Sequence, residues 1–264
     1  MLADTVHLRV GALALRLAIV LAAAGLSAPV WAQTGGTARV RTRSYFFAEA
    51  GRGSDYKLFV SSRYQLGVPA PLIVALHPFA TAPERILLYQ GLLGLAEERG
   101  YLAVAPTGFD TRAWYAADGT EPGSGAGLSE RDVMNVLAAV REQYTIDPNR
   151  IYLMGHSMGG GGTWQLGIRH RDVWAALAPV APAISSSPDA LDAILDIPVI
   201  VIQGTADASV DVASTRRWIA KMKDLGMTYE YVEVPGGDHT SIISRSPENM
   251  RKIFDFFDKA SRSR

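Results

Sequence analysis

The chain has 264 residues, a formal net charge of zero and no cysteine. The balanced charge gives no electrostatic reason to expect nucleic acid or an anionic membrane surface as a partner. The lack of cysteine excludes disulfides, thiolate metal sites and a cysteine nucleophile. With 48% hydrophobic and 20% charged residues, the composition is that of a globular protein, long enough for one α/β domain with a sizeable core.

The first 32 residues have the pattern of a secretory signal. A positively charged start precedes an apolar run at 17–26, and a small-x-small cleavage site ends at Ala32. The run is short for a membrane span, although an uncleaved anchor is the alternative. We therefore expect a signal peptide at 1–32, a single domain at 33–264, a secreted or periplasmic location and no stable membrane insertion after signal removal.

From the mature start onward, strand and helix patterns alternate along the chain. Five apolar runs suit buried strands, and two alternating segments before them suit strands at a sheet edge. The edge strands are expected at 39–47 and 56–62, the buried strands at 72–76, 101–105, 150–154, 175–180 and 198–203, and a last strand at 228–234. Helices are expected at 83–99, 130–143, 158–170, 212–225 and 247–260. This order predicts an α/β fold with a mainly parallel sheet and helices on both faces.

The least regular segment is 106–129, which contains Trp114, Tyr115 and a glycine-rich stretch at 119–127. It is too long for a simple connection between a strand and a helix. We expect a mobile loop close to the functional site.

The most informative motif is Gly155-x-Ser157-x-Gly159, directly after the strand at 150–154. A strand that turns sharply at a serine and continues at once as a helix exposes the serine hydroxyl. Glycines are needed at the flanking positions because side chains there would collide with the strand or the helix. Ser157 is therefore the candidate nucleophile; the alternative is a tight turn with a capping serine.

A serine hydroxyl needs a base, and the base needs an orienting carboxylate. His239 suits the base because it lies in the loop between the last strand and the last helix. The other four histidines lie in the signal, in the motif itself, at a helix end and after the strand at 72–76, namely His7, His156, His170 and His77. His77 is best explained as a structural histidine.

Asp207 suits the orienting carboxylate because it follows the next-to-last strand. Asp211 is expected to cap the helix that begins there, and Asp238 adjoins His239 on the wrong side to orient it. The resulting order is Ser157, Asp207, His239.

The oxyanion that forms on attack needs two backbone N–H donors. Met158 follows the nucleophile at a helix start, and Phe79 lies in the loop after the strand at 72–76. These two residues are the candidate oxyanion hole. No cofactor or metal is expected, because the sequence has no His-Glu-x-x-His and no carboxylate cluster at ligand spacing.

From about residue 56 to 257 the chain resembles secreted α/β-hydrolase esterases of the polyhydroxybutyrate-depolymerase and feruloyl-esterase type, often grouped with prolyl-oligopeptidase-like hydrolases. The matching segments are Leu76-His77-Pro78-Phe79, Ile146-Asp147-Pro148-Asn149-Arg150-Ile151-Tyr152, Gly155-His156-Ser157-Met158-Gly159-Gly160, Gln203-Gly204-Thr205-Ala206-Asp207 and Gly237-Asp238-His239-Thr240. The motif around Ser157 also resembles that of bacterial cutinases and polyester hydrolases. The chain departs from the family at Pro78, where the family has glycine, and at Asp211, where it has proline.

The resemblance implies an α/β-hydrolase fold. Few residues separate the strands at 175–180 and 198–203, so no large cap domain is expected. An open site suits extended or polymeric esters. Candidate apolar contacts for a substrate are Trp114, Tyr115, Trp164, Ile184 and Phe79. Packing in the core is the alternative for Trp164, and the one that its place on a helix favours.

The function expected from these residues is hydrolysis of carboxylic esters through an acyl-enzyme on Ser157, by a monomer whose partner is a small-molecule or polymeric ester. A serine peptidase is one alternative, although the chain has no room for a separate peptide-docking domain. A hydrolase scaffold that binds without catalysis is another.

Overall fold

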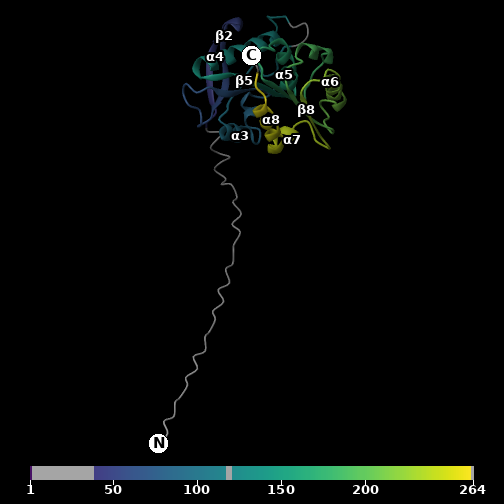
Figure 1. Cartoon of the computed structure of the whole chain (residues 1–264). Helices are drawn as coiled ribbons and strands as arrows, with labels where there is room; N and C mark the ends of the chain where they lie inside the picture. The colour runs from purple at the N-terminus through teal and green to yellow at the C-terminus, as the bar shows by residue number, and fades with distance from the viewer. Residues whose placement is uncertain (2–38, 117–120, 263–264) are drawn as a thin grey trace.

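The computed structural model describes Met1 and residues 39–116 and 121–262 (Figure 1). Apart from Met1, the predicted signal peptide at 1–32 lies outside the described residues. Within these ranges no helix is both long and apolar enough to cross a membrane.

The core of the fold is an eight-stranded sheet with the order β1-β2-β4-β3-β5-β6-β7-β8. The strands are β1 Arg41–Phe47, β2 Arg52–Val60, β3 Ala70–Leu76, β4 Leu102–Pro106, β5 Ile146–His156, β6 Ala176–Val180, β7 Val199–Gly204 and β8 Tyr229–Val234. β1 and β2 pair antiparallel at one edge, and all strands from β4 to β8 in that order are parallel. The predicted mainly parallel sheet with an antiparallel edge is confirmed.

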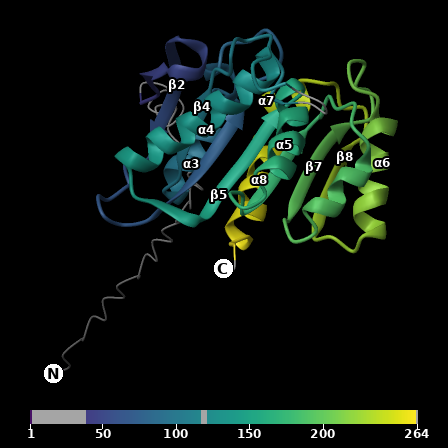
Figure 2. The same ribbon diagram turned by 90° about the horizontal axis from the view of Figure 1, so that it is seen from above.

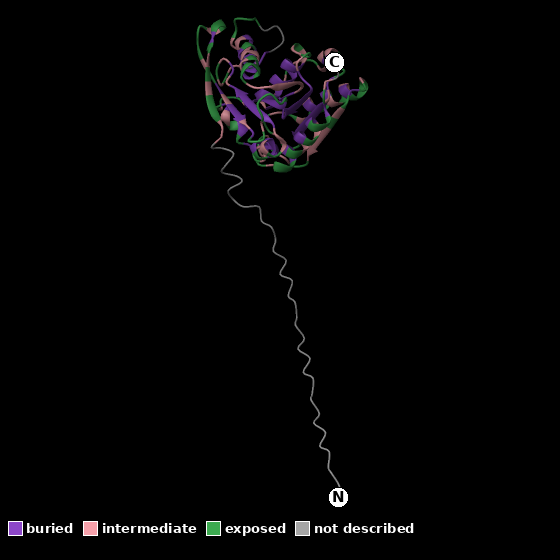
Figure 3. Cartoon of the chain, turned by 60° about the vertical axis from the view of Figure 1, so that its left-hand side comes forward, coloured by how far each residue is buried: buried purple, intermediate pink, exposed green. Residues whose placement is uncertain are grey.

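Helices cover both faces of this sheet because its inner strands are apolar on both sides. The helices are α2 Glu84–Leu87, α3 Leu92–Arg99, α4 Gly125–Gln143, α5 Met158–Arg169, α6 Val212–Asp224, α7 Ser241–Ser244 and α8 Pro247–Lys259, with short 3-10 turns η1 Ala48–Ala50 and η2 Pro188–Ala193. α4, α5 and α6 pack on one face, and α2, α3, α7 and α8 pack on the other (Figure 2). Alternate residues of β3 enter the two cores, and the inner strands β3, β4, β6 and β7 are buried along their whole length (Figure 3).

Two predicted elements differ from the structure. The helix expected at 83–99 is interrupted between α2 and α3, where Gly91 adopts φ 93°, a left-handed conformation that glycine accepts without steric cost. The segment expected to be a loop at 106–129 already enters α4 at Gly125, because the Ser124 hydroxyl accepts a hydrogen bond from the amide of Gly127 and caps the helix.

The parallel strands bring four loops to one edge of the sheet. β3, β5, β7 and β8 run in the same direction, so the segments that follow their carboxyl ends meet there. Ligand sites in open α/β sheets form at this edge.

Candidate active site

The chain turns sharply at Ser157, between β5 and α5. Ser157 has φ 57° and ψ −116°, a backbone conformation that a residue with a side chain rarely adopts. A Cβ atom added to Gly155 would lie 2.1 Å from the carbonyl oxygen of Gly159, and one added to Gly159 would lie 2.1 Å from that of Leu76. Glycine at both positions therefore lets strand and helix approach, and it presents the serine at the sheet edge.

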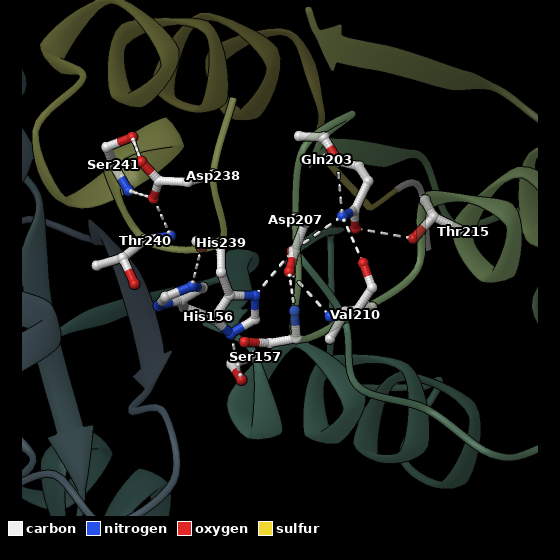
Figure 4. Close-up of polar contacts among 12 residues, drawn as sticks. His156, Ser157, Gln203, Asp207, Val210, Thr215, Asp238, His239, Thr240 and Ser241 are labelled. Carbon is white, nitrogen blue, oxygen red and sulfur yellow. Dashed lines mark hydrogen bonds and ion pairs between the residues drawn. The ribbon is translucent and has the colours of Figure 1, made fainter. Parts of the chain in front are cut away.

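Ser157, His239 and Asp207 form one hydrogen-bonded cluster (Figure 4). Oγ of Ser157 lies 2.8 Å from Nε2 of His239, and Nδ1 of His239 lies 2.7 Å from Oδ2 of Asp207. The Asp207 side chain is fully buried, whereas that of His239 keeps 19% of its surface exposed. An ionised Asp207 can only accept, so Nδ1 carries the proton and Nε2 is free to accept from the serine hydroxyl.

The loop after β7 holds the Asp207 carboxylate. Its Oδ1 accepts from the amides of Ser209 and Val210, both at 2.8 Å, and its Oδ2 also accepts from Nε2 of Gln203 at 3.0 Å. Burial by itself would raise the pKa of Asp207, but the hydrogen bonds from His239, Val210 and Ser209 outweigh it and lower this pKa below its usual value. The carboxylate therefore stays ionised beside the imidazole.

Gln203 is a member of the site that residue-type reasoning did not identify. Its Nε2 donates to Asp207 and to the carbonyl of Val210, while its Oε1 accepts from the Thr215 hydroxyl at 2.9 Å. The signal that could have identified Gln203 is its place as a polar residue inside an apolar strand. Its side chain is fully buried in the structure. A buried amide is stabilised only when its donors and acceptor find partners, and these three residues supply them.

The two other candidate carboxylates play the parts expected of them. Asp211 caps α6 by accepting from the amide of Ala213. Asp238 accepts from the Ser241 hydroxyl and from the amides of Ser241 and Thr240, away from the imidazole, and these bonds lower its pKa to about 2. Neither orients His239.

The two predicted oxyanion donors both have unpaired backbone amides in the described part of the chain. Met158 is the first residue of α5, and its amide has no hydrogen-bond partner among the described residues. The amide of Phe79 is likewise unpaired within that part of the chain, and the loop that carries it runs against Gly159 through the carbonyls of Leu76 and His77. Both N–H groups are therefore free to bind an oxygen, and their role in the oxyanion hole stays a prediction.

Two of the five predicted substrate contacts are buried in the core. Trp164 is fully buried and stacks on Trp218, with 4.7 Å between the ring centroids, and Tyr115 is 1% exposed and packs against Gly162. Their burial contradicts the predicted substrate contacts, because such side chains offer no surface to a ligand. Both belong to the core under α5.

Trp114 and Phe79 keep 44% and 47% of their surface exposed. Ile184 is half-buried in the segment that follows Ala183, whose carbonyl oxygen approaches Gly161 of α5. These three residues remain candidates for an apolar rim around Ser157. His77 is buried, and its ring nitrogens lie 2.9 and 3.1 Å from the carbonyl oxygens of Pro78 and Thr107, as a structural histidine would.

His156 lies inside the motif, directly before Ser157. It is 2% exposed, and its ring nitrogens lie 2.7 Å from the Tyr89 hydroxyl and 2.8 Å from the carbonyl oxygen of His239. Burial lowers its pKa to about 4. The ring is therefore neutral near pH 7.

This low pKa predicts a specific loss of stability in acid. The folded pKa lies below the usual 6.5, so the unfolded chain binds the proton more tightly, and the free energy of unfolding falls as the pH drops from 6.5 to 4. Integrated over that window, His156 contributes a loss of about 3 kcal/mol. Urea unfolding of the wild type and of His156→Gln at pH 7 and pH 4.5 measures it, because the comparison cancels the carboxylates common to both. An equal acid loss in the two proteins would contradict the assignment.

Across the ranges 39–116 and 121–262, no group of three or more His, Asp or Glu side chains is arranged to hold a metal ion. The cluster itself contains a hydroxyl, an imidazole and a carboxylate in series, which is suited to proton transfer and nucleophilic attack.

The known proteins that this chain resembles in sequence are described as PET hydrolase-like or as esterases. A family model described as PETase, PET hydrolase-like, matches residues 130–257. The putative esterase NocK of Nocardia uniformis subsp. tsuyamanensis is 31% identical over 166 residues, which cover 60% of this chain and 46% of that protein. The bifunctional acetylxylan esterase/xylanase XynS20E of Neocallimastix patriciarum is 25% identical over 187 residues, 70% of this chain and 26% of that protein.

Solved structures show the same fold. A CE1 ferulic acid esterase from Anaeromyces mucronatus superimposes with a TM-score of 0.66 at 16% identity, over 84% of this chain and 90% of that one. A thermostable esterase superimposes with a TM-score of 0.69 at 21% identity, over 85% of this chain and 64% of that one. The chain has the fold of these esterases. It spans less than half the length of the curated relatives it matches.

Proposed function

We propose that this protein, which has the α/β-hydrolase fold, is an esterase that cleaves carboxylic esters through an acyl-enzyme on Ser157. The observation that carries the proposal is the continuous chain of hydrogen bonds from Ser157 through His239 to the buried Asp207. The relatives that match are described as esterases, which supports an ester as substrate.

In the first half of the reaction, Oγ of Ser157 attacks the ester carbonyl carbon while Nε2 of His239 takes the hydroxyl proton. The carbonyl oxygen becomes an oxyanion, which the amides of Met158 and Phe79 would stabilise. Asp207 stays ionised and stabilises the imidazolium. His239 then gives the proton to the departing alkoxide, which leaves as the alcohol and leaves the acyl group on Ser157.

In the second half, water takes the place of the alcohol. His239 removes one proton from the water as its oxygen attacks the acyl carbon. The bond to Oγ breaks, the proton returns to Ser157 and the carboxylic acid leaves. Each half begins and ends with neutral imidazole, so one base serves both.

The surroundings of Ser157 favour esters of an aromatic or extended kind. Only η2 and short connections lie between β6 and β7, so no cap domain covers the site from that segment. The exposed rings of Trp114 and Phe79 offer flat apolar surface to an acyl group or a polymer chain. A relative named feruloyl esterase B, from Thermothelomyces thermophilus, is 25% identical over 124 residues, which supports aromatic acids among the substrates.

The expected setting is outside the cytoplasm. The signal pattern at 1–32 supports secretion or a periplasmic location, and the lack of cysteine suits a mature domain that folds without disulfides. We propose that the mature enzyme acts as a monomer.

Hydrolysis of p-nitrophenyl acetate, butyrate, octanoate and palmitate, beside the matching p-nitroanilides, tests the proposal. We expect rapid release from the short esters and little from the anilides. Faster anilide cleavage would favour a serine peptidase. A protein that neither hydrolyses an ester nor reacts with a fluorophosphonate would be a binding scaffold, and the proposal would be wrong.

A further inference from the structure

A second line of polar contacts reaches the candidate base His239 from the face of the sheet that α2, α3, α7 and α8 cover. Tyr89 lies in the break between α2 and α3 and is buried. Its hydroxyl lies 2.7 Å from Nδ1 of His156. Nε2 of His156 lies 2.8 Å from the carbonyl oxygen of His239 (Figure 4). Three residues that are distant in the sequence thus form one buried chain that ends on the main chain of the base.

The direction of each hydrogen bond follows from the chemistry of the end groups. The carbonyl oxygen of His239 can only accept, so Nε2 of His156 must carry the ring proton. In a neutral ring Nδ1 is then bare, and the Tyr89 hydroxyl must donate to it. The His239 carbonyl therefore sets the tautomer of His156, and the Tyr89 hydroxyl stabilises that tautomer by donating to its bare Nδ1.

We propose that Tyr89 and His156 are a positioning pair that fixes the main chain of His239 and so keeps its ring aligned with Ser157 and Asp207. The inference rests on the proposed function of the Ser157 cluster. Neither residue touches the reacting atoms. Both act through the backbone of the base.

The base needs such an anchor because one of its two side-chain contacts is lost during turnover. Once Oγ of Ser157 carries the acyl group, it no longer donates to Nε2 of His239. The ring must nevertheless stay in place to activate water. Asp207 then holds the side chain and His156 holds the carbonyl, which leaves the ring little freedom to turn.

The pair also keeps positive charge away from the imidazolium. The rings of His156 and His239 lie 4.9 Å apart between centroids. A charged His156 would oppose the protonation of His239 that the reaction requires. The groups facing His156 are the Tyr89 hydroxyl, His239 and, further away, Asp207, and burial keeps the ring neutral.

The segment that carries Tyr89 is itself tied to the base loop. The amide of Gln90 donates to the carbonyl of Ser244 at the end of α7, and Gly91 packs against Pro247. The interruption between α2 and α3 therefore serves the site. A continuous helix could not place the Tyr89 hydroxyl on His156 and also make the contacts of Gln90 and Gly91 with the segment after His239.

A matched pair of substitutions separates positioning from packing. In His156→Gln the amide nitrogen reaches the place of Nε2 and still donates to His239. In His156→Asn, one methylene shorter, the side chain reaches only toward Tyr89. Tyr89→Phe removes the hydroxyl and keeps the ring. The double variant Tyr89→Phe with His156→Gln completes a cycle.

With p-nitrophenyl butyrate we expect kcat to fall roughly 10- to 100-fold in His156→Asn and about 10-fold in Tyr89→Phe, with KM little changed. His156→Gln should keep most of the activity. When His156 is already glutamine, Tyr89→Phe should lower kcat much less than it does in the wild type. The amide nitrogen of glutamine is always a hydrogen-bond donor, so its bond to the His239 carbonyl does not depend on the Tyr89 hydroxyl. The proposal would be overturned if kcat fell equally in His156→Gln and His156→Asn. It would also be overturned if Tyr89→Phe lowered kcat equally in the wild type and in His156→Gln.

Nitrogen-15 NMR of the imidazole rings tests the same idea without any substrate. We expect the Nε2–H tautomer for His156 in the wild type and partial loss of it in Tyr89→Phe. An Nδ1–H tautomer in the wild type would refute the positioning pair even if esters are hydrolysed. Conversely, the expected tautomer in a protein that hydrolyses no ester would refute the proposed function and leave the contact standing as a structural one. Melting temperatures of all variants report whether each one folds.

Discussion

Ser157→Ala is expected to lower kcat for ester hydrolysis by roughly 10⁶-fold, the scale of loss when the nucleophile of a hydrogen-bonded serine cluster is removed. No other hydroxyl contacts Nε2 of His239 in the described part of the chain, so no group nearby can replace Oγ. The remaining activity would come from the free amides of Met158 and Phe79, which still polarise a bound carbonyl.

Steady-state hydrolysis of p-nitrophenyl butyrate and covalent labelling by a fluorophosphonate measure this effect. Ser261→Ala is the matched control, because Ser261 is exposed near the C-terminus and outside the cluster. It should retain both activity and labelling. If Ser157→Ala still hydrolysed the ester or took up the label, the turn at Ser157 would not be the working site.

Asp207→Asn should lower kcat roughly 10⁴-fold, because the surrounding donors force the amide into the wrong orientation. The amides of Ser209 and Val210 donate to Oδ1, so the amide oxygen must stay there. The new NH₂ group then faces Nδ1 of His239, which has to become an acceptor. The ring proton moves to Nε2, where it blocks uptake of the serine proton.

Asp211→Asn is the control for this variant, since Asp211 caps α6 four residues further along and does not contact His239. We expect less than about a twofold change, because asparagine is as good a cap as aspartate. Single-turnover acylation would show where the loss arises. A similar loss in the two variants would mean that the loop, not the carboxylate, matters, and Asp207 would lose its assigned role.

The sequence alone was enough to predict the frame of the site. Apolar runs long enough for strands and the 3.6-residue periodicity of the helices predicted the parallel sheet. The glycines around Ser157 are a local steric requirement, and they are readable without any tertiary contact. Asp207 and His239 could be chosen because strand order alone brings the loops after β7 and β8 to the carboxyl edge, beside Ser157.

The break at Gly91 could not be predicted in the same way. The sequence from 83 to 99 is compatible with one helix, and the interruption is stabilised by contacts with α7 and α8, far along the chain. The burial of Trp164 and Tyr115 is likewise a tertiary outcome, since an aromatic residue on a helix or in a loop suits core and surface alike.

The hydrogen bonds that support the cluster were also beyond the sequence. Tyr89 and His156 are 67 positions apart, and His156 and His239 are 83 positions apart. Gln203 was visible only as a polar residue in an apolar strand. Local patterns determined which side chains can perform the chemistry, because steric and periodic rules act within a few residues. Only the tertiary structure decided what holds those side chains in place, because a buried polar atom takes whichever partner the packed core brings within reach.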